Sequence, residues 1–440
     1  MIDPTVARIE RLLRNPLVLI TAAVVLAAPV ALLAWLLWPW YGAFVQGLLA
    51  DAFWFPLLFM LFVLVMILNA TALCILAERK IAGFTQDRRG PNRVGFWGLL
   101  QPIADGLKFL FKEDIIPANV DRGLFLLAPC LALIPALIGF AIIPWAGEVR
   151  WPWMPADAPA VSTQAASLDV GFLYLLAVGS LGVYGVVLAG YASNNKYSFY
   201  GGMRATAQMI SYELPMGLAL LCLLMTAGSL RPEEIVAQQA GSGVWYVFLH
   251  PLAFLLLLTS SFAETNRAPF DLAEAEQELV GGFHTEYSSM KFAMFFLAEY
   301  AHMITGSALL VALFFGGWHF WGLPGAEDTS WVAMLLRLAV FVGKVVLFIG
   351  LFMMIRWTIP RFRFDQLMRI AWLGMLPAGV VLLAGTAVLA ALGLERNLWA
   401  CLALNVAVLA GMLVYVGRSR RPVTGRQPDL PPVPVGAVSG

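Results

Sequence analysis

Ten stretches of about 20 mainly apolar residues follow one another along the chain, and they limit its fold more than any other feature. A helix needs about this length to cross the hydrocarbon core of a bilayer. Because 60% of the residues are hydrophobic and only 12% are charged, the chain has more apolar surface than one water-soluble core can bury. The sequence therefore predicts an all-α polytopic membrane protein. The expected spans are residues 17 to 38, 52 to 77, 124 to 145, 170 to 191, 205 to 228, 244 to 262, 289 to 315, 331 to 355, 370 to 392 and 398 to 416.

The Lys and Arg residues predict how these spans are oriented. With ten spans and both termini on one side, only Arg150, Arg231 and Arg396 fall in the opposite loops, while Arg337 and Lys344 lie within a span. The rest of the 28 Lys and Arg residues share the side of the termini. Cytoplasmic loops carry such an excess of positive charge, so both termini and the loops with polar motifs are expected in the cytoplasm.

Several classes of function lack their motifs. A net charge of +1 provides no field to attract nucleic acid, and no glycine-rich nucleotide loop is found in the sequence. The four histidines form no H-E-x-x-H motif, and a packed or interfacial position is expected for each. The cysteines show no C-x-x-C spacing, so the chain is expected to bind no metal, nicotinamide, flavin or iron–sulfur centre itself. Apolar packing is expected for Cys74, Cys130, Cys222 and Cys401.

The first polar loop begins where the second expected span ends, at Glu78 and Arg79. A Gly-Pro-Asn triplet at residues 90 to 92 predicts a turn that returns the chain to the membrane surface. From residue 99 to 111, apolar and charged residues alternate at helical spacing, which predicts an amphipathic helix in the membrane plane. On charge alone, a basic loop anchored by a surface helix explains this segment.

Three ionisable residues within expected spans are candidates for function. Glu213 is expected about two turns inside the fifth span, after Gly201 and Gly202 have allowed a tight re-entry, and Glu299 is expected level with it in the seventh. A carboxylate within a membrane costs several kcal/mol unless it is paired or hydrated. A proton path is the default interpretation, and a neighbouring hydroxyl group that satisfies Glu213 is the alternative. For Lys344, a functional role and a structural one through snorkelling or a carboxylate partner are equally open.

An acidic loop lies between these two glutamates in the sequence. It contains only two basic residues, Arg267 and Lys291, and its acids are interleaved with apolar residues, so part of it is expected to pack. Like charges at this density raise one another's pKa values and titrate as a coupled set, which suits proton exchange near neutral pH. A solvated acidic loop is the alternative. The acids are Glu264, Asp271, Glu274, Glu276, Glu278 and Glu286.

These polar blocks, together with two shorter motifs, resemble the NuoH family of membrane subunits in proton-pumping NADH:quinone oxidoreductases, whose mitochondrial member is subunit 1 of complex I. The resemblance covers roughly residues 50 to 392. It implies a core of eight spanning helices whose cytoplasmic loops form the membrane floor of a quinone chamber. The blocks are residues 77 to 114, 190 to 217 and 261 to 303, with FFGGW at 314 to 318 and R-x-T-x-P-R-x-R-x-D-Q-L-M at 356 to 368.

The resemblance also implies roles for single residues. Glu78 and Arg79 are expected at the mouth of the quinone chamber, with further chamber positions at Arg88, Arg89 and Asp105. A charged funnel is expected to link this chamber to the proton-pumping helices. The expected proton-path residues are Glu213, Glu264, Glu274, Glu276, Glu278, Glu286 and Glu299.

A member of this family is expected to act as one subunit of a respiratory enzyme in the bacterial inner (plasma) membrane. Quinone is the expected substrate, and FMN and the iron–sulfur clusters are expected on partner subunits. The expected partners are the lipid bilayer, neighbouring small membrane subunits, and the hydrophilic-arm subunits with the quinone site and the terminal iron–sulfur cluster. A homologous membrane anchor of an energy-converting hydrogenase is the alternative. An ion-coupled transporter is a more distant one, because matched Gly or Pro breaks in two halves are not evident.

Four segments are expected along the chain. Residues 51 to 392 form the membrane core with its cytoplasmic loops. Residues 1 to 50 and 393 to 417 each add a transmembrane helix outside the core, and both added helices are expected to be peripheral. Residues 418 to 440 are rich in proline and poor in apolar residues, so a disordered cytoplasmic tail is expected.

Overall fold

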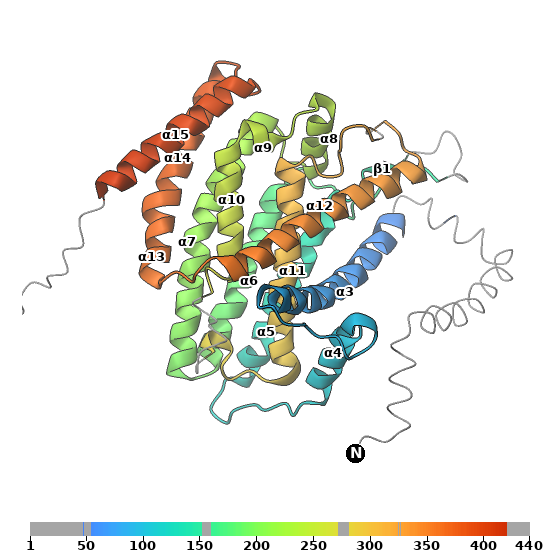
Figure 1. Cartoon of the computed structure of the whole chain (residues 1–440), viewed down its shortest axis with the longest axis vertical. Helices are drawn as coiled ribbons and strands as arrows, with labels where there is room; N and C mark the ends of the chain where they lie inside the picture. The colour runs from blue at the N-terminus through green and yellow to red at the C-terminus, as the bar shows by residue number, and fades with distance from the viewer. Residues whose placement is uncertain are drawn as a thin grey trace, which may run out of the picture.

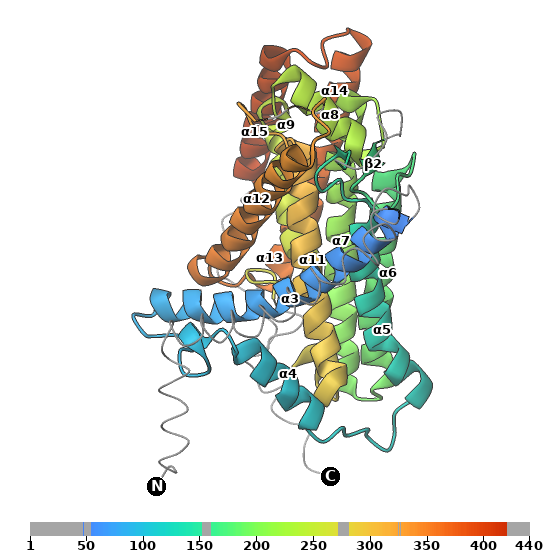
Figure 2. The same cartoon turned by 90° about the vertical axis from the view of Figure 1, so that its right-hand side faces the viewer.

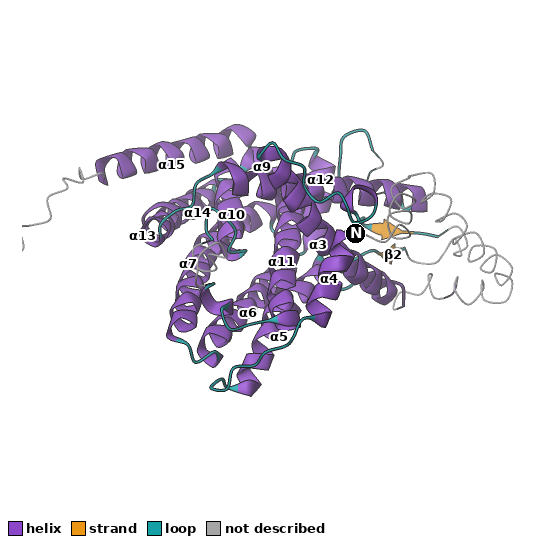
Figure 3. Cartoon of the chain, turned by 60° about the horizontal axis from the view of Figure 1, so that its bottom comes forward, coloured by secondary structure: helices purple, strands orange, loops and turns teal. Residues whose placement is uncertain are grey.

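The computed structural model describes residues 47, 54 to 151, 160 to 271, 281 to 323, 325 and 327 to 419. Within these ranges, eight helices are long and apolar enough to cross a membrane, and helices make up most of the described chain (Figure 3). The all-α expectation is confirmed, whereas the span expected at residues 17 to 38 lies outside the described residues. The eight are α3 (Trp54–Thr85), α5 (Arg122–Ile138) with the turn η2 (Gly139–Ile142), α6 (Gly171–Ala192), α7 (Lys196–Ala227), α11 (Ser289–Phe314), α12 (Trp331–Thr358), α14 (Leu376–Ala391) with the turns that lead into it from Phe364, and α15 (Leu398–Ser419).

Helices α5, α6, α7 and α11 form the centre of the bundle, and α10 (Pro251–Glu264) packs against α7 and α11 (Figure 1). Glycine lets these helices approach closely, because a Cβ added to Gly185 of α6 would lie 2.6 Å from the backbone nitrogen of Ala132 of α5. Small residues stabilise helix pairs in membranes, where lipid provides no hydrophobic gain for association. By contrast, α3 and α12 cross the bundle obliquely, and both contact α11 (Figure 2).

Short elements complete the fold. Helix α4 (Gln101–Phe111) contacts α3 and α11 and is amphipathic, as the spacing of its residues predicts. Its large apolar side chains are exposed, from Ile103 to Phe111. The strands β1 (Glu148–Val149) and β2 (Val161–Ser162) pair antiparallel, with Glu148 opposite Ser162. The remaining elements are η1 (Phe96–Gly98), α8 (Pro232–Ser242), α9 (Tyr246–Leu249), η3 (Gly282–His284), α13 (Phe364–Arg369) and the π-helical turn η4 (Ile370–Met375).

The turn between α6 and α7 is shorter than expected. Helix α7 begins at Lys196, and the side chain of Asn195 caps it by accepting a hydrogen bond from the backbone N–H of Tyr197. The expected re-entry at Gly201 and Gly202 is wrong, because both glycines lie inside α7. A Cβ on Gly201 would lie 2.7 Å from the backbone of Gly282, so glycine is needed there for close packing. Glu213 consequently lies about five turns into its helix, not two.

The span expected at residues 244 to 262 is not continuous. It is divided into α9 and α10, and His250, with φ −126° and ψ 61°, separates the two helices. Pro251 occupies the first turn of α10, where its missing N–H leaves no hydrogen bond unmade. His250 is buried, and its Nε2 lies 2.8 Å from the hydroxyl of Thr226 in α7. The expectation of a single span here is therefore wrong.

Helix α15 holds this break together from the outside. The Asn405 side chain, only 3% exposed, accepts a hydrogen bond of 3.1 Å from the backbone N–H of Leu252 and donates one of 3.1 Å to the carbonyl of Leu249. One amide thus satisfies a donor of α10 and an acceptor of α9. Although α15 lies at the edge of the bundle (Figure 1), it contributes polar contacts to the broken helix.

Lys344 of α12 has a structural role that neither proposed alternative described. Its ammonium group donates to the carbonyl oxygens of Phe315, Gly317 and His319 at 2.7, 2.9 and 2.6 Å. These carbonyls follow the end of α11, where the helix leaves acceptors without intrahelical partners. Lys344 therefore fixes the chain after α11 and needs neither snorkelling nor a carboxylate partner.

Replacing Asn405 by Ala should loosen α15 from the bundle. The change leaves the N–H of Leu252 and the carbonyl of Leu249 without this partner, and each buried polar group left so costs about 1 to 3 kcal/mol. We expect a lower midpoint of thermal unfolding in detergent and faster thiol labelling of Cys401, which is buried one turn away. Val406→Ala on the same helix, at a side chain 64% exposed, is the control. Equal behaviour of the two variants would contradict the assigned role.

Candidate functional site

A cavity of about 980 Å³ opens between α3, α4, α11 and the end of α12. Ile75, Phe109, Phe296 and other apolar side chains cover most of its wall. This volume lies at the upper end of the range for small-molecule sites, which are mainly apolar with a few placed polar groups. Four residues expected in one chamber line this cavity, namely Glu78, Arg79, Arg88 and Asp105. Arg89 is exposed and is not among the lining residues.

The exposed side of the cavity carries a charged group built from α3 and α4. Arg79 Nη1 lies 2.7 Å from Asp105 Oδ2, and Lys108 Nζ lies 3.6 Å from Asp105 Oδ1. Arg88 hydrogen-bonds to the side chain of Gln86. Glu78 and Arg79 were expected to pair with each other, but their side chains have different partners. Neighbouring residues on a helix point about 100° apart, so Arg79 turns to α4 while Glu78 turns into the bundle.

Glu78 belongs to a buried ion network centred on Arg267. Arg267 Nη2 lies 3.1 Å from Glu78 Oε2, and Arg267 Nε lies 2.8 Å from Glu299 Oε1, with the Arg267 side chain only 1% exposed. Arg356 at the end of α12 forms a second ion pair with Glu78. The hydroxyl of Tyr300 donates to Glu78 at 2.7 Å, and the Tyr300 ring lies 4.2 Å from the Arg267 guanidinium. Two carboxylates and two guanidinium groups thus balance in charge.

The electrostatics of this network keep Arg267 charged. Burial disfavours the charged guanidinium, but the carboxylates of Glu299 and Glu78 outweigh burial and raise the pKa of Arg267. Because Glu78 also lines the cavity, a change of charge in the cavity acts directly on this network. Such a buried network is rigid as long as all its members keep their charge.

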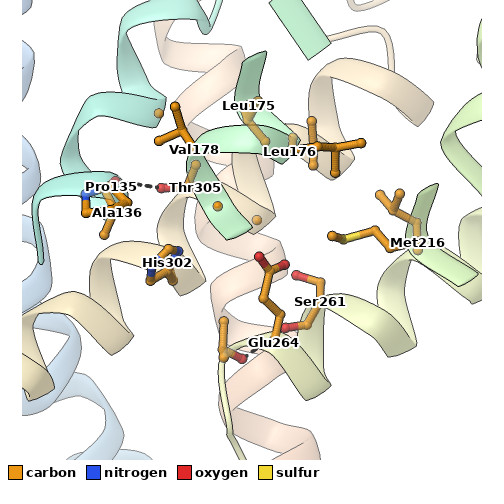
Figure 4. Close-up of a pocket in the computed structure, with 16 residues that line it drawn as sticks. Pro135, Ala136, Leu175, Leu176, Val178, Met216, Ser261, Glu264, His302 and Thr305 are labelled. Carbon is orange, nitrogen blue, oxygen red and sulfur yellow. Dashed lines mark hydrogen bonds between the residues drawn. The ribbon is translucent and has the colours of Figure 1, made fainter. Parts of the chain in front are cut away.

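A second acidic group lies apart from this network. The Ser180 hydroxyl of α6 hydrogen-bonds to Glu213, and both line a small cavity with Glu264, the last residue of α10. Glu264 also lines a neighbouring cavity of about 40 Å³ with His302 of α11 (Figure 4). Glu213 and Glu299 were expected at one level as a pair, yet Glu213 is grouped with Glu264 and Glu299 with Arg267. The alternative of a hydroxyl partner for Glu213 holds, although the partner comes from α6.

The acidic loop is only partly described. Asp271 forms an ion pair of 3.1 Å with Arg361, and Glu286 accepts a hydrogen bond of 2.6 Å from Asn195 at the start of α7. Glu274, Glu276 and Glu278 lie outside the described residues. In the described part of the loop, the acids have separate partners and do not form one cluster.

Sequence reasoning did not assign roles to Arg267, Arg356, Tyr300 and Ser180, which hold the buried acids. Arg267 had been noted only as a countercharge in an acidic loop. A usable signal was present, since Arg356 ends a long apolar helix and Arg267 follows one closely. Basic residues at such depths need acidic partners. Across the ranges that the structure covers, no group of three or more His, Cys, Asp or Glu side chains is placed to hold a metal ion.

Comparisons with known proteins agree with this architecture. The family model described as NADH dehydrogenase matches residues 57–387. The chain is similar to the NADH-quinone oxidoreductase H subunit of Leptospira biflexa, with 50% identity over 321 residues, 71% of this chain and 88% of that protein. For the first of the numbered H subunits of Geobacter sulfurreducens, identity is 50% over 338 residues, 76% and 94% of the two chains. For the H subunit of Flavobacterium johnsoniae it is 47% over 307 residues, 69% and 86%.

Replacing Arg267 by Leu should strongly destabilise the bundle. Glu78 and Glu299 lose their shared cation, and breaking a buried ion pair costs about 3 to 5 kcal/mol. We expect a lower thermal unfolding midpoint and less protein in the membrane. Adding Glu78→Gln and Glu299→Gln to Arg267→Leu removes the stranded charges and should recover part of this loss. If the triple variant is no more stable than the single one, the network does not act through its charges.

Lowering the pH from 7 to 5 should open the segment around His284. Burial lowers the pKa of His284 from its ordinary 6.5 to about 4, so the unfolded segment takes up a proton first. Stability from the neutral ring is therefore lost as the pH falls below about 6.5. Amide hydrogen exchange in residues 281 to 288, corrected for intrinsic rates, should be faster at pH 5. His284→Phe keeps the ring contacts to Phe283 and Phe292 and should remove the difference; an unchanged pH response in this variant argues against the assignment.

Proposed function

Since the chain belongs to the NuoH family of NADH-quinone oxidoreductase subunits, the multi-pass H subunits of bacterial complex I, we propose that it lines the quinone-binding chamber and couples quinone reduction to proton translocation. One observation carries this proposal. Glu78 lines the 980 Å³ cavity and is also an ion-pair partner of Arg267, which holds Glu299. A single carboxylate thus belongs both to the cavity and to the buried acids.

The cavity suits a quinone in its shape and chemistry. A quinone has a polar ring with two carbonyl oxygens and a long apolar tail. The phenylalanine-rich wall fits the tail, and Arg79, Arg88 and Asp105 offer polar groups to the ring. Arg79 and Arg88 carry N–H donors that match carbonyl oxygens. The exposed apolar face of α4 would then lie toward lipid, the source of a membrane quinone.

Coupling follows from the order of the charged groups. When quinone is reduced, its ring takes up protons and the charge balance in the cavity changes. Glu78 responds through Arg267, and Arg267 follows Glu264 by three residues at the end of α10. A shift in Arg267 therefore moves the backbone that carries Glu264, which shares a cavity with Glu213. Proton exchange at these two carboxyl groups is the step by which this subunit would pass the change inward.

This function places the redox centres elsewhere. FMN and the iron–sulfur clusters would sit on partner subunits of complex I, and this chain would supply protein contacts to quinone without electron carriers of its own. The loops around α4 and η3 would face the hydrophilic arm on the cytoplasmic side. The three similar proteins are all named as NADH-quinone oxidoreductase subunits, which favours the quinone enzyme over the hydrogenase anchor. Within the described ranges, the His250 break favours no transporter, because its counterpart in a second half is not found.

The substitutions Glu213→Gln and Glu299→Gln test the proposal. Each keeps the shape and hydrogen bonding of the side chain but cannot carry a proton, so quinone-linked NADH oxidation and proton pumping should fall about tenfold or more. Both can be measured in inverted membrane vesicles, with a pH-gradient dye for pumping. NADH oxidation by a hydrophilic electron acceptor should remain near wild type.

Glu234→Gln on α8 is the matched control, because Glu234 is exposed and pairs with Arg231 away from both cavities. It should leave all three activities unchanged. Normal pumping in the combined Glu213→Gln and Glu299→Gln variant would mean that the buried carboxylates are structural, and the coupling role would have to be abandoned.

A further inference from the structure

The 40 Å³ cavity beside Glu264 is enclosed by α5, α6, α7, α10 and α11. Its walls are mostly apolar, with Pro135, Leu175, Met216 and similar residues. Figure 4 shows the carboxyl group of Glu264 pointing into this space near Ser261, with His302 on another side. Glu264 and His302 are its titratable lining residues, while Glu213 faces Glu264 from α7 through the adjoining small cavity. The cavity thus joins ionisable side chains of two helices.

The polar groups of this cavity divide into two kinds. Thr305 donates to the carbonyl of Ala301 at 2.9 Å, and Thr265 donates to the carbonyl of Ser261 at 3.1 Å. In the part of the chain that the structure describes, the Glu264 carboxyl and the His302 ring have no protein group within hydrogen-bond distance. Buried polar groups in native proteins are almost always hydrogen-bonded, to protein or to ordered water. Both side chains therefore require a partner that the protein itself does not provide.

The dimensions of the cavity identify that partner as water. One water molecule needs roughly 10 to 15 Å³ of such space and two to four polar partners. A volume of about 40 Å³ holds two or three, and Glu264, Ser261 and His302 provide the partners. Glycines of α6 keep the space open: a Cβ on Gly179 would lie 3.1 Å from Glu264 Oε1, and one on Gly182 would lie 3.4 Å from His302 Nε2.

We propose that two or three bound water molecules connect Glu264 to His302, and that His302 is a proton-relay residue next to the acids of the coupling path. In the forward step, the O–H bond of protonated Glu264 breaks, an intervening water passes on a proton, and an N–H bond forms on the imidazole. The products are a carboxylate and an imidazolium, and the reverse step restores both neutral groups. No oxidant, reductant or co-reactant takes part. This inference rests on the proposed coupling function and extends it to α11.

Three variants separate a relay from a structural role. His302→Gln keeps a hydrogen bond to water but cannot take up a proton, whereas His302→Leu removes both abilities. Glu264→Gln blocks the other end. We expect all three to lower pumping and quinone-linked NADH oxidation about fivefold or more in inverted vesicles, while oxidation by a hydrophilic acceptor stays near wild type. His319→Gln, a histidine outside both cavities, is the control and should behave as wild type.

The outcomes distinguish the two proposals. If Glu264→Gln and Glu213→Gln both pump normally, the coupling function itself fails. If these two are impaired while His302→Gln pumps normally, the coupling function stands and the relay is overturned, because His302 would only hold water in place. A high-resolution experimental map of the wild-type complex provides a test that needs no variant to fold. Ordered water between Glu264 and His302 supports the proposal, and a dry cavity overturns it.

Discussion

The structure depends on one buried cation. Arg267 lies where water is excluded, and a charge there is tolerated only because carboxylates from two directions meet it. Those carboxylates belong to α3 and α11, Arg356 of α12 joins through Glu78, and Arg267 itself follows α10. Four segments far apart in the sequence are thus fixed at one point. The oblique paths of α3 and α12 become intelligible, since each must reach the same network with its last turns (Figure 2).

The sequence predicted the spanning helices well, because a long apolar stretch has few alternatives in a membrane. It failed where a helix continues beyond the bilayer. Residues 196 to 204 of α7 are polar or aromatic and partly exposed, so an apolar window does not detect them, and Glu213 was placed too near the helix start. The break at His250 was missed for a different reason: α9 and α10 are both apolar, and only Asn405 of a distant helix satisfies the backbone between them.

Of the candidate site, the sequence revealed the ionisable residues but not their partners. Glu78 and Arg79 show why. They are adjacent and opposite in charge, yet the helix directs one to Arg267 and the other to Asp105. Helical geometry alone would have separated them, but their partners come from segments between about 26 and 280 residues away, which no local pattern can indicate. The separation of Glu213 from Glu299 has the same origin, because their depth was judged from helix ends that were themselves misplaced.

Helix α10 connects these observations into one mechanical unit. It is only 14 residues long, about 21 Å, and a helix of that length behaves as a rigid rod. At its start, Asn405 of α15 binds the backbone on both sides of the break, and at its end lie Glu264 and, three residues on, Arg267. The ion network and the water-sized cavity are therefore attached to the same rod. Helix α15 lies beyond the residues matched by the family model, yet its docking sets where that rod begins and so helps to set where Glu264 meets His302.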